Sequence, residues 1–194
     1  MQAPTPSRIA IMGVTSSGKS TLGTTLSKKL DIPFIESDAL LWAPNWQKAA
    51  DYVEKVTEAT SGPTWVMASA SSSVRKMVLS RANVVVWLDY PLWLVLWQLV
   101  RRSVSRWWTR ELLWGTNYET LWVHFKIWSD DSLVYWLFKT FWRRRREYPL
   151  LFQEHPHLQV LRFYHPDETQ AWLNSLAPAQ TIGSTSTDDG QYTT

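Results

Sequence analysis

Eight consecutive residues near the start of the chain form a complete phosphate-binding motif. The run from Gly13 to Ser20 reads GVTSSGKS and matches the pattern G-x-x-x-x-G-K-[ST] at every fixed position. Glycines at both ends let the backbone turn tightly enough for successive N–H groups to point at phosphate oxygens. Lys19 then reaches the β- and γ-phosphates, and the Ser20 hydroxyl binds Mg²⁺. The predicted ATP-binding residues are Gly13, Ser16, Ser17, Gly18, Lys19, Ser20 and Thr21.

The residues on either side of the motif predict the elements that it needs. Arg8–Met12 has the pattern of a short buried strand that leads into the loop. Beyond the motif, Leu22, Leu26 and Leu30 repeat at helical spacing, and Pro33 ends the helix. A helix N-terminus adds positive charge to a phosphate-binding loop. We therefore predict a nucleotide-binding loop and not an accidental turn.

The rest of the chain alternates between strand and helix patterns. Further strands are predicted near 32–36, 64–67, 83–88 and 158–163, and helices near 48–60, 74–78 and 166–176. This alternation predicts an α/β fold with a parallel sheet and helices on both faces. We expect one domain over residues 1–177, with a helical insert or lid at about 91–153. Residues 178–194 are rich in Ser, Thr, Gly and Asp and are expected to be a disordered tail.

The composition excludes several kinds of chemistry. There is no cysteine among the 194 residues, so disulfides, thiolate metal sites and cysteine nucleophiles are excluded. The formal charge of +3 is too small to indicate nucleic-acid binding by itself. No signal pattern precedes the first strand, and Asp89 and Pro91 interrupt the most apolar stretch. We expect a cytoplasmic protein without a membrane partner.

The tryptophan content is high, at 14 residues. We expect most of these side chains to pack in the core or on a face of the domain. Trp42 and Trp46 can either stack on an acceptor or fill an apolar seam.

Two aspartates follow predicted strands. Asp89 comes directly after the apolar run 83–88, which is the pattern of a Walker B carboxylate that binds Mg²⁺. Its alternative role is to cap the helix that begins near Pro91. Asp38 follows the strand at 32–36 and is predicted to be a catalytic base or a ligand of metal-bound water. Its alternative role is a turn or cap residue.

Arginines supply the charge that phosphoryl transfer requires. Four of them are consecutive at 143–146, and Arg143 is our catalytic candidate from this cluster. Because successive helical residues point about 100° apart, only one or two of the four are expected to face a site. The alternative is a basic helix end that complements the helix dipole. Further arginines in the predicted lid are Arg101, Arg102, Arg106 and Arg110.

Several of these segments together resemble one known group. The segments are the phosphate loop, Asp38–Trp42, Asn45-Trp46, Val84–Pro91 and Trp142–Arg146, in this order. The combination resembles adenylate-kinase-like P-loop proteins that are often labelled DNA topology modulation proteins. The resemblance covers roughly residues 9–172. It implies a nucleoside-monophosphate-kinase-like fold, with a five-stranded parallel sheet, a P-loop, an acceptor-side segment and an arginine-bearing lid.

The chain departs from this group after the third strand. Relatives carry an Asp-Gly run there, and the Asp helps to hold Mg²⁺ through water. This chain has Ala68-Ser69-Ala70 instead. Either Asp38 or Asp89 takes over that role, or catalysis is weakened or absent.

Three hypotheses about function follow. The favoured one is an ATP- and Mg²⁺-dependent phosphotransferase that acts on a small acceptor. The second is a nucleotide-binding regulator with weakened catalysis, because of Ala68-Ser69-Ala70. The third is a nucleic-acid-associated ATPase, because arginines alternate with tryptophans at 101–108 and 142–146. The histidines show no metal-ligand spacing.

Overall fold

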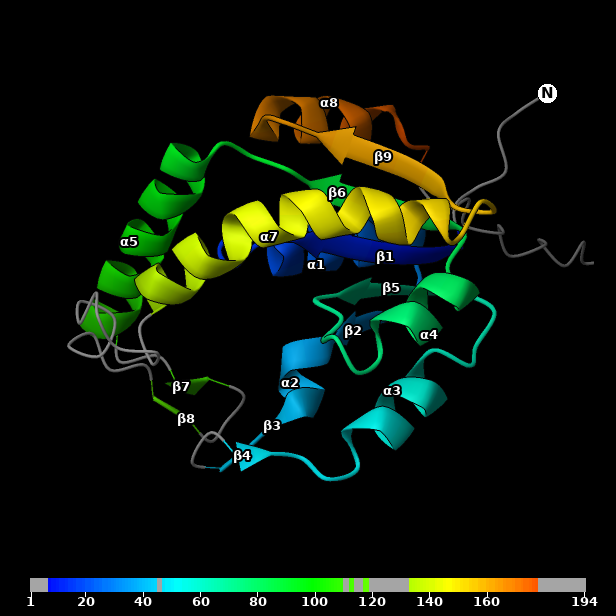
Figure 1. Cartoon of the computed structure of the whole chain (residues 1–194), viewed down its shortest axis with the longest axis horizontal. Coiled ribbons are helices and arrows are strands. Elements are labelled where there is room, and N and C mark those ends of the chain that lie inside the picture. The colour runs from blue at the N-terminus through cyan, green and yellow to red at the C-terminus, as the bar shows by residue number, and fades with distance from the viewer. Residues whose placement is uncertain (1–6, 45–46, 110–111, 114–116, 119–132, 178–194) are drawn as a thin grey trace, which may run out of the picture.

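Five parallel strands form the main sheet of the protein. The computed structural model describes residues 7–44, 47–109, 112–113, 117–118 and 133–177. Within this part, the strand order is β2-β5-β1-β6-β9 (Figure 1). The strands are β1 (Arg8–Gly13), β2 (Phe34–Glu36), β5 (Trp65–Ala68), β6 (Val84–Leu88) and β9 (Gln159–Phe163). The five-stranded parallel sheet implied by the sequence is confirmed.

Helices alternate with these strands along the chain. They are α1 (Lys19–Leu30), α2 (Ser37–Leu41), α3 (Tyr52–Ala59), α4 (Arg75–Arg81), α5 (Leu92–Thr109), α7 (Leu133–Gln153) and α8 (Pro166–Ser175). Two short antiparallel pairs accompany them. They are β3 (Trp42–Ala43) with β4 (Gln47–Lys48), and β7 (Leu112–Leu113) with β8 (Asn117–Tyr118).

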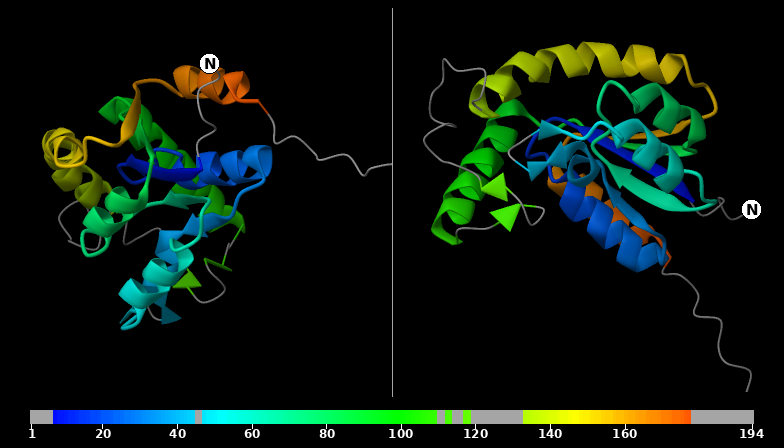
Figure 2. Two further views of the ribbon diagram at one scale, coloured as in Figure 1. Left: turned by 90° about the vertical axis from the view of Figure 1, so that its right-hand side faces the viewer. Right: turned by 90° about the horizontal axis from the view of Figure 1, so that it is seen from below.

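The sheet is covered on both faces, because its central strands are apolar on both sides. Ile9 and Ile11 of β1 pack in a cluster with apolar residues of α1, α5 and α8. Ala10 and Met12 alternate with them and pack in a second cluster with residues of α3, α4 and α7. Figure 2 shows α1 and α8 on one side of the sheet and α7, α4 and α3 on the other. Helix α7 also extends beyond the sheet, where Leu137 packs near α5.

The order of the strands determines where a site can form. The loop after β1 lies at the centre of the sheet, between the ends of β5 and β6. In open parallel sheets, ligands bind beyond the carboxyl ends of the strands. The loop after β1 and the segment after β2 therefore meet at this edge.

Several sequence-based boundaries differ from the structure. The helix predicted at 48–60 is shorter, because Gln47–Lys48 pairs with Trp42–Ala43 as a strand. In its described part, the interval 91–153 contains α5, α7 and the β7–β8 pair. Most tryptophans were expected in the core or on a packed face of the domain, and among the residues described Trp65 and Trp87 are the buried ones. Trp46 and the tail 178–194 lie outside the described residues, and the division into one domain and a tail stays a prediction.

The contact between α1 and β2 yields a test of the packing. A Cβ at Gly23 of α1 would overlap the ring of Phe34. We expect Gly23→Ala to lower the free energy of unfolding by about 1–3 kcal/mol, which is typical of overpacking. Alanine by itself favours a helix by about 0.5–1 kcal/mol over glycine. A loss therefore reports the clash, and urea denaturation measures it.

The matched control is Gly62→Ala, because the nearest atom to a Cβ there is the Thr64 carbonyl oxygen at 3.9 Å. We expect a change within about 0.5 kcal/mol for this variant. If Gly23→Ala is as stable as the parent, the described packing of α1 on β2 is wrong.

Candidate active site

The phosphate-binding motif forms the loop between β1 and α1. A Cβ on Gly13 would lie 2.6 Å from Ser17 Oγ and 2.9 Å from the Leu88 carbonyl oxygen. Gly18 has a left-handed φ of 89°, which favours glycine. The Val14 carbonyl accepts hydrogen bonds from Ser17 Oγ at 2.9 Å and from Lys19 Nζ at 2.6 Å. The two glycines are therefore required by the shape of the loop itself.

The residues of this loop fit a phosphate group. Ser16 Oγ is buried and has no hydrogen-bond partner among the described residues. Ser20 and Thr21 are exposed in the first turn of α1, and that turn holds no acidic residue. No side chain caps the helix N-terminus, so its backbone N–H groups can serve an anion. The loop thus offers donors and positive charge at one point.

Lys19 lies within a group of charges. Burial of the ammonium group, aided by the positive charge of Arg144 and opposed by Asp38, lowers the pKa of Lys19 from 10.5 to about 8. An incoming phosphate would reverse this shift, because an anion stabilises the charged form. Lys19 is thus placed where a phosphate is favoured.

Asp38 and Glu36, at the end of β2, both lie near Lys19. Burial raises the pKa of Asp38, while Lys19, Arg144, Arg102 and a hydrogen bond with Ser69 hold it down. The structure thus places the predicted base on α2, within the electrostatic reach of the phosphate loop.

The sequence analysis did not single out Glu36. Burial raises its pKa as well, and a hydrogen bond with Ser20 opposes that shift. Glu36 Oε1 is buried without a hydrogen-bond partner among the described residues. The signal was the Glu36-Ser37-Asp38 run, which puts two carboxylates at one strand end.

Arg144 is the member of the arginine cluster that reaches the loop. It donates a hydrogen bond from Nη1 to the Gly13 carbonyl oxygen at 2.8 Å. Arg143, our candidate from the sequence, is half exposed and pairs with Glu147 at 3.5 Å, one turn further along α7. As expected, only part of the arginine cluster at 143–146 faces the site, but the residue beside the loop is Arg144 and not Arg143. Adjacent helical residues point about 100° apart, so only the rotation of α7 decides between them.

Asp89 lies in a pair of ion pairs at the end of β6. Its side chain is 3% exposed, Oδ1 lies 2.5 Å from Arg145 Nε, and Oδ2 lies 2.5 Å from Arg162 Nη2. Arg145 also donates to the Asp89 backbone carbonyl at 3.1 Å. The Arg162 guanidinium stacks on the ring of Trp87 at 4.0 Å from its centroid.

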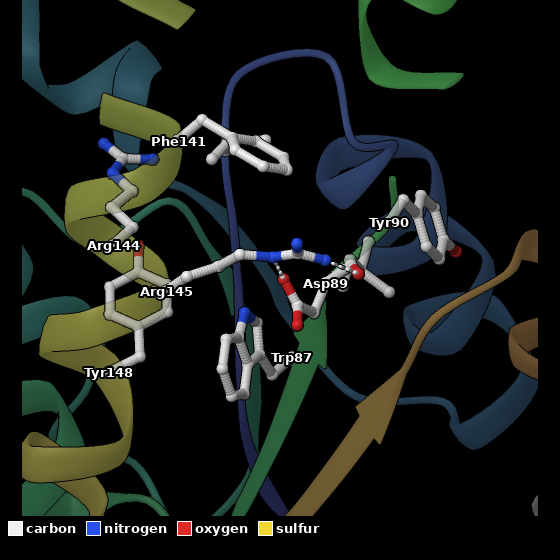
Figure 3. A pocket seen from close by; sticks show the side chains of 9 residues that line it. Trp87, Asp89, Tyr90, Phe141, Arg144, Arg145 and Tyr148 are labelled. Carbon is white, nitrogen blue, oxygen red and sulfur yellow. Dashed lines mark hydrogen bonds and ion pairs between the residues drawn. The ribbon is translucent and has the colours of Figure 1, made fainter. Parts of the chain in front are cut away.

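Both carboxylate oxygens of Asp89 thus accept hydrogen bonds from guanidinium groups. This geometry favours a structural role for Asp89 over the predicted Mg²⁺ ligation, and the metal role stays a prediction. Figure 3 shows Arg145 reaching across a small pocket to Asp89, with Trp87 and Tyr148 beside it. The ion pairs join α7 to β6 and β9.

The described residues give Mg²⁺ few protein ligands. They contain no cluster of three or more His, Asp or Glu side chains placed to hold a metal ion. Ser20 and Glu36 are the neighbouring oxygen donors at the loop. Mg²⁺ commonly keeps several waters and binds one or two protein oxygens together with substrate phosphates. The donor set therefore fits nucleotide-bound Mg²⁺ and not a dedicated metal cage.

At the end of β5, where the resembled group carries Asp-Gly, the structure has Ala68 and Ser69. Ala68 is fully buried at the end of β5. Ser69 follows with a left-handed φ of 67°, a conformation that glycine adopts at lower cost. Trp42 is half buried in β3, and Trp46 lies outside the described residues.

Comparisons with known proteins point to small-molecule kinases. A family model described as shikimate kinase matches residues 15–61, which include the loop from Thr15 onward and Asp38. A shikimate kinase of Symbiobacterium thermophilum is 29% identical over 98 residues, or 42% of this chain and 56% of that protein. The uncharacterized protein YqaC of Bacillus subtilis is 28% identical over 115 residues, or 57% of this chain and 65% of that protein. The alignments thus span less than two thirds of either relative.

A solved structure agrees with these matches over more of the chain. Shikimate kinase from Acinetobacter baumannii, solved in complex with shikimate, has a TM-score of 0.54 at 19% identity, and covers 88% of this chain and 92% of that one. The chain has the α/β fold of P-loop kinases. The matches support a kinase-like P-loop protein. They do not show membership of the DNA topology modulation group that the motifs resemble.

Asp89 provides the test of this arrangement. We expect Asp89→Asn to lower the free energy of unfolding by about 3–5 kcal/mol, because two arginines lose a buried counter-charge. Urea denaturation without nucleotide or Mg²⁺ measures this loss. The matched control is Glu147→Gln, which removes an exposed ion pair and should cost at most about 0.5 kcal/mol.

The alternative role of Asp89 gives the opposite pattern. If Asp89 only binds Mg²⁺, the stability measured without metal will be unchanged in Asp89→Asn. That result would contradict the structural role.

Proposed function

We propose that the chain is an ATP-dependent phosphotransferase that phosphorylates a hydroxyl group of a small acceptor. One observation carries this proposal. Lys19, Asp38 and Arg144 converge beside the phosphate-binding loop, although they belong to three separate segments. The kinase comparisons, which include the acceptor-side residue Asp38, support it.

The charges of the site favour two negatively charged substrates, the nucleotide and an acidic acceptor. Lys19, Arg102 and Arg144 contribute three positive charges, against the two carboxylates Glu36 and Asp38. A local excess of positive charge draws in phosphates and acidic acceptors. Since the matching proteins act on or bind a hydroxylated acid, shikimate, we propose an acceptor of that chemical class.

The proposed reaction assigns a role to each group. Asp38 takes the proton of the acceptor hydroxyl, and its raised pKa suits a base that operates near neutral pH. The hydroxyl oxygen then bonds to the γ-phosphorus, while the bond to the bridging oxygen breaks and ADP leaves. Lys19, Arg144 and the loop N–H groups stabilise the charge on the transferred group. Ser20, with Glu36 nearby, would hold Mg²⁺, which would neutralise negative charge on the nucleotide phosphates.

A second candidate rests on Ala68. Alanine cannot orient a metal-bound water. In this alternative, the chain is a nucleotide-binding regulator with negligible turnover. The nucleic-acid-associated ATPase is less well supported, because Arg144 and Arg145 bond to the loop and to Asp89. Membership of the DNA topology modulation group, and a cytoplasmic location, remain expectations from the sequence.

Binding and turnover of MgATP test the proposal. We expect calorimetry to detect MgATP binding by the parent chain and none by Lys19→Ala. Labelled ATP should then transfer phosphate to at least one acceptor in a panel of hydroxylated acids, sugars and nucleoside monophosphates. Binding without transfer to any acceptor would favour the regulator. No binding would contradict both.

Two adjacent arginines give a sharper test of the site. We expect Arg144→Met to lower kcat by about 10²–10³-fold, which is typical when one charge-stabilising donor is removed. Arg143→Met should change kcat by less than about twofold, because an exposed surface pair contributes little. The two variants make the same change at neighbouring positions of α7, and steady-state kinetics compares them. A large loss in Arg143→Met alone would restore the candidate chosen from the sequence.

A further inference from the structure

The outward side of α5 carries a continuous row of exposed apolar side chains. Trp93 is 67% exposed, Trp97 55%, Val100 41% and Val104 47%. Their spacing of four, three and four residues puts them on one face of a helix, over a length of about 16 Å. We name these four residues the outer face of α5. An apolar row of this kind marks a surface that meets another molecule or a membrane.

The opposite side of α5 belongs to the body of the protein. Val95 and Leu99 are buried in the core cluster that includes α1 and β1. Arg102 lies about 180° around the helix from the outer face, and its charge lowers the pKa of Lys19. The described core and the proposed site therefore use the opposite side of α5.

The charges on α5 have a single sign. The 18 residues LWLVLWQLVRRSVSRWWT contain no Asp or Glu, and of their arginines Arg102 faces the proposed site while Arg101 lies beside the outer face. Arg101 is exposed, and its guanidinium lies 5.5 Å from the ring centroid of Trp97, at the border of the outer face. The complementary partner is thus apolar in part and negatively charged.

The position of α5 leaves this face accessible. Figure 1 shows α5 at one end of the molecule, away from β5, α3 and α4, and Figure 2 shows it again at that end in a perpendicular view. A straight helix at the end of the molecule can lie against a flat surface without displacing the sheet.

We propose that the outer face of α5 docks on an anionic lipid bilayer, with the helix parallel to the membrane surface. Interfacial helices combine Trp and aliphatic residues on one face with Lys or Arg beside them. Tryptophan favours the boundary between acyl chains and headgroups, and Arg101 lies where lipid phosphates would be. This is docking from one side, since none of the described helices has the length and hydropathy needed to cross a membrane. The proposal differs from the sequence-based expectation of no membrane partner.

Two other occupants fit less well. A second copy of the chain would bring Arg101 of both copies to the same interface, and α5 offers no carboxylate to neutralise them. A single-stranded nucleic acid needs aromatic rings for base stacking, whereas Val100 and Val104 form half of the outer face. Acyl chains accept both tryptophan and valine.

Vesicle flotation with the full chain tests the proposal. We expect binding to vesicles of phosphatidylcholine with phosphatidylglycerol, and much weaker binding to phosphatidylcholine alone. The double change Trp93→Gln with Trp97→Gln should weaken binding roughly tenfold or more. Arg101→Gln should weaken binding to the anionic vesicles by about fivefold, and added salt should reduce that difference.

The control is Val53→Gln on α3, which changes an apolar residue that is 45% exposed, close to the 47% of Val104, on a different surface. It should bind as the parent does, and thermal unfolding should show that all variants are folded. Three results would overturn the proposal. They are no flotation at low salt, flotation that the double change does not affect, or a dimer or oligonucleotide complex that depends on the outer face while vesicles do not bind.

Discussion

The buried carboxylate of Asp89 is the interaction on which the arrangement of the site depends. It accepts hydrogen bonds from Arg145 of α7 and Arg162 of β9, and so joins two segments that follow it by 56 and 73 residues. The helix that carries Arg145 also carries Arg144, one position earlier. Once Arg145 is fixed on Asp89, the rotation of α7 directs Arg144 towards the Gly13 carbonyl. A structural ion pair thereby sets the position of a charge beside the phosphate loop.

The site then combines charges that would repel one another without anions. Arg144 and Arg102 both lower the pKa of Lys19, and the two nearby carboxylates only partly compensate. Burial meanwhile raises the pKa of Asp38 and of Glu36. Each of these pKa shifts reports a charged group that is less stable than in water while no ligand is bound. Bound phosphate and Mg²⁺ would stabilise these charges. Polar groups held in this way are frequent at functional sites.

Within the described part of the chain, helix α5 contributes charge to this arrangement through Arg102. Arg102 faces the charged group, whereas the outer face of the same helix points away from it. A surface that holds α5 would therefore act on a helix that contributes charge to the proposed site. The proposed docking surface and the proposed phosphoryl-transfer site would then lie on two sides of one helix.

The local features were predictable from the sequence, and the long-range ones were not. The phosphate loop is contiguous, and the strand Val84–Leu88 has the continuous apolar pattern of a buried parallel strand. The choice of Arg144 over Arg143 depends on the rotation of α7, which is set by residues far away in sequence. Asp89 has a Walker B pattern, but the two guanidinium groups that occupy its oxygens are visible only in three dimensions.

The tryptophans show the same limit. Trp87 and Trp93 are both flanked by apolar residues in the sequence, yet Trp87 is 4% exposed and Trp93 is 67% exposed. Whether a helix face is covered depends on which elements pack against it. Periodicity identifies the apolar face of α5 but cannot say what lies over it.

The central claim is that Lys19 and Arg144 form one phosphate-binding group with the loop. A crystal structure with Mg²⁺ and a non-hydrolysable ATP analogue tests it most directly. We expect Lys19 Nζ to leave the Val14 carbonyl for the β- and γ-phosphates, and Arg144 to lie within hydrogen-bond distance of the γ-phosphate, while Asp89 keeps both its arginines. A nucleotide bound elsewhere, or phosphates that leave Lys19 on Val14, would contradict the account.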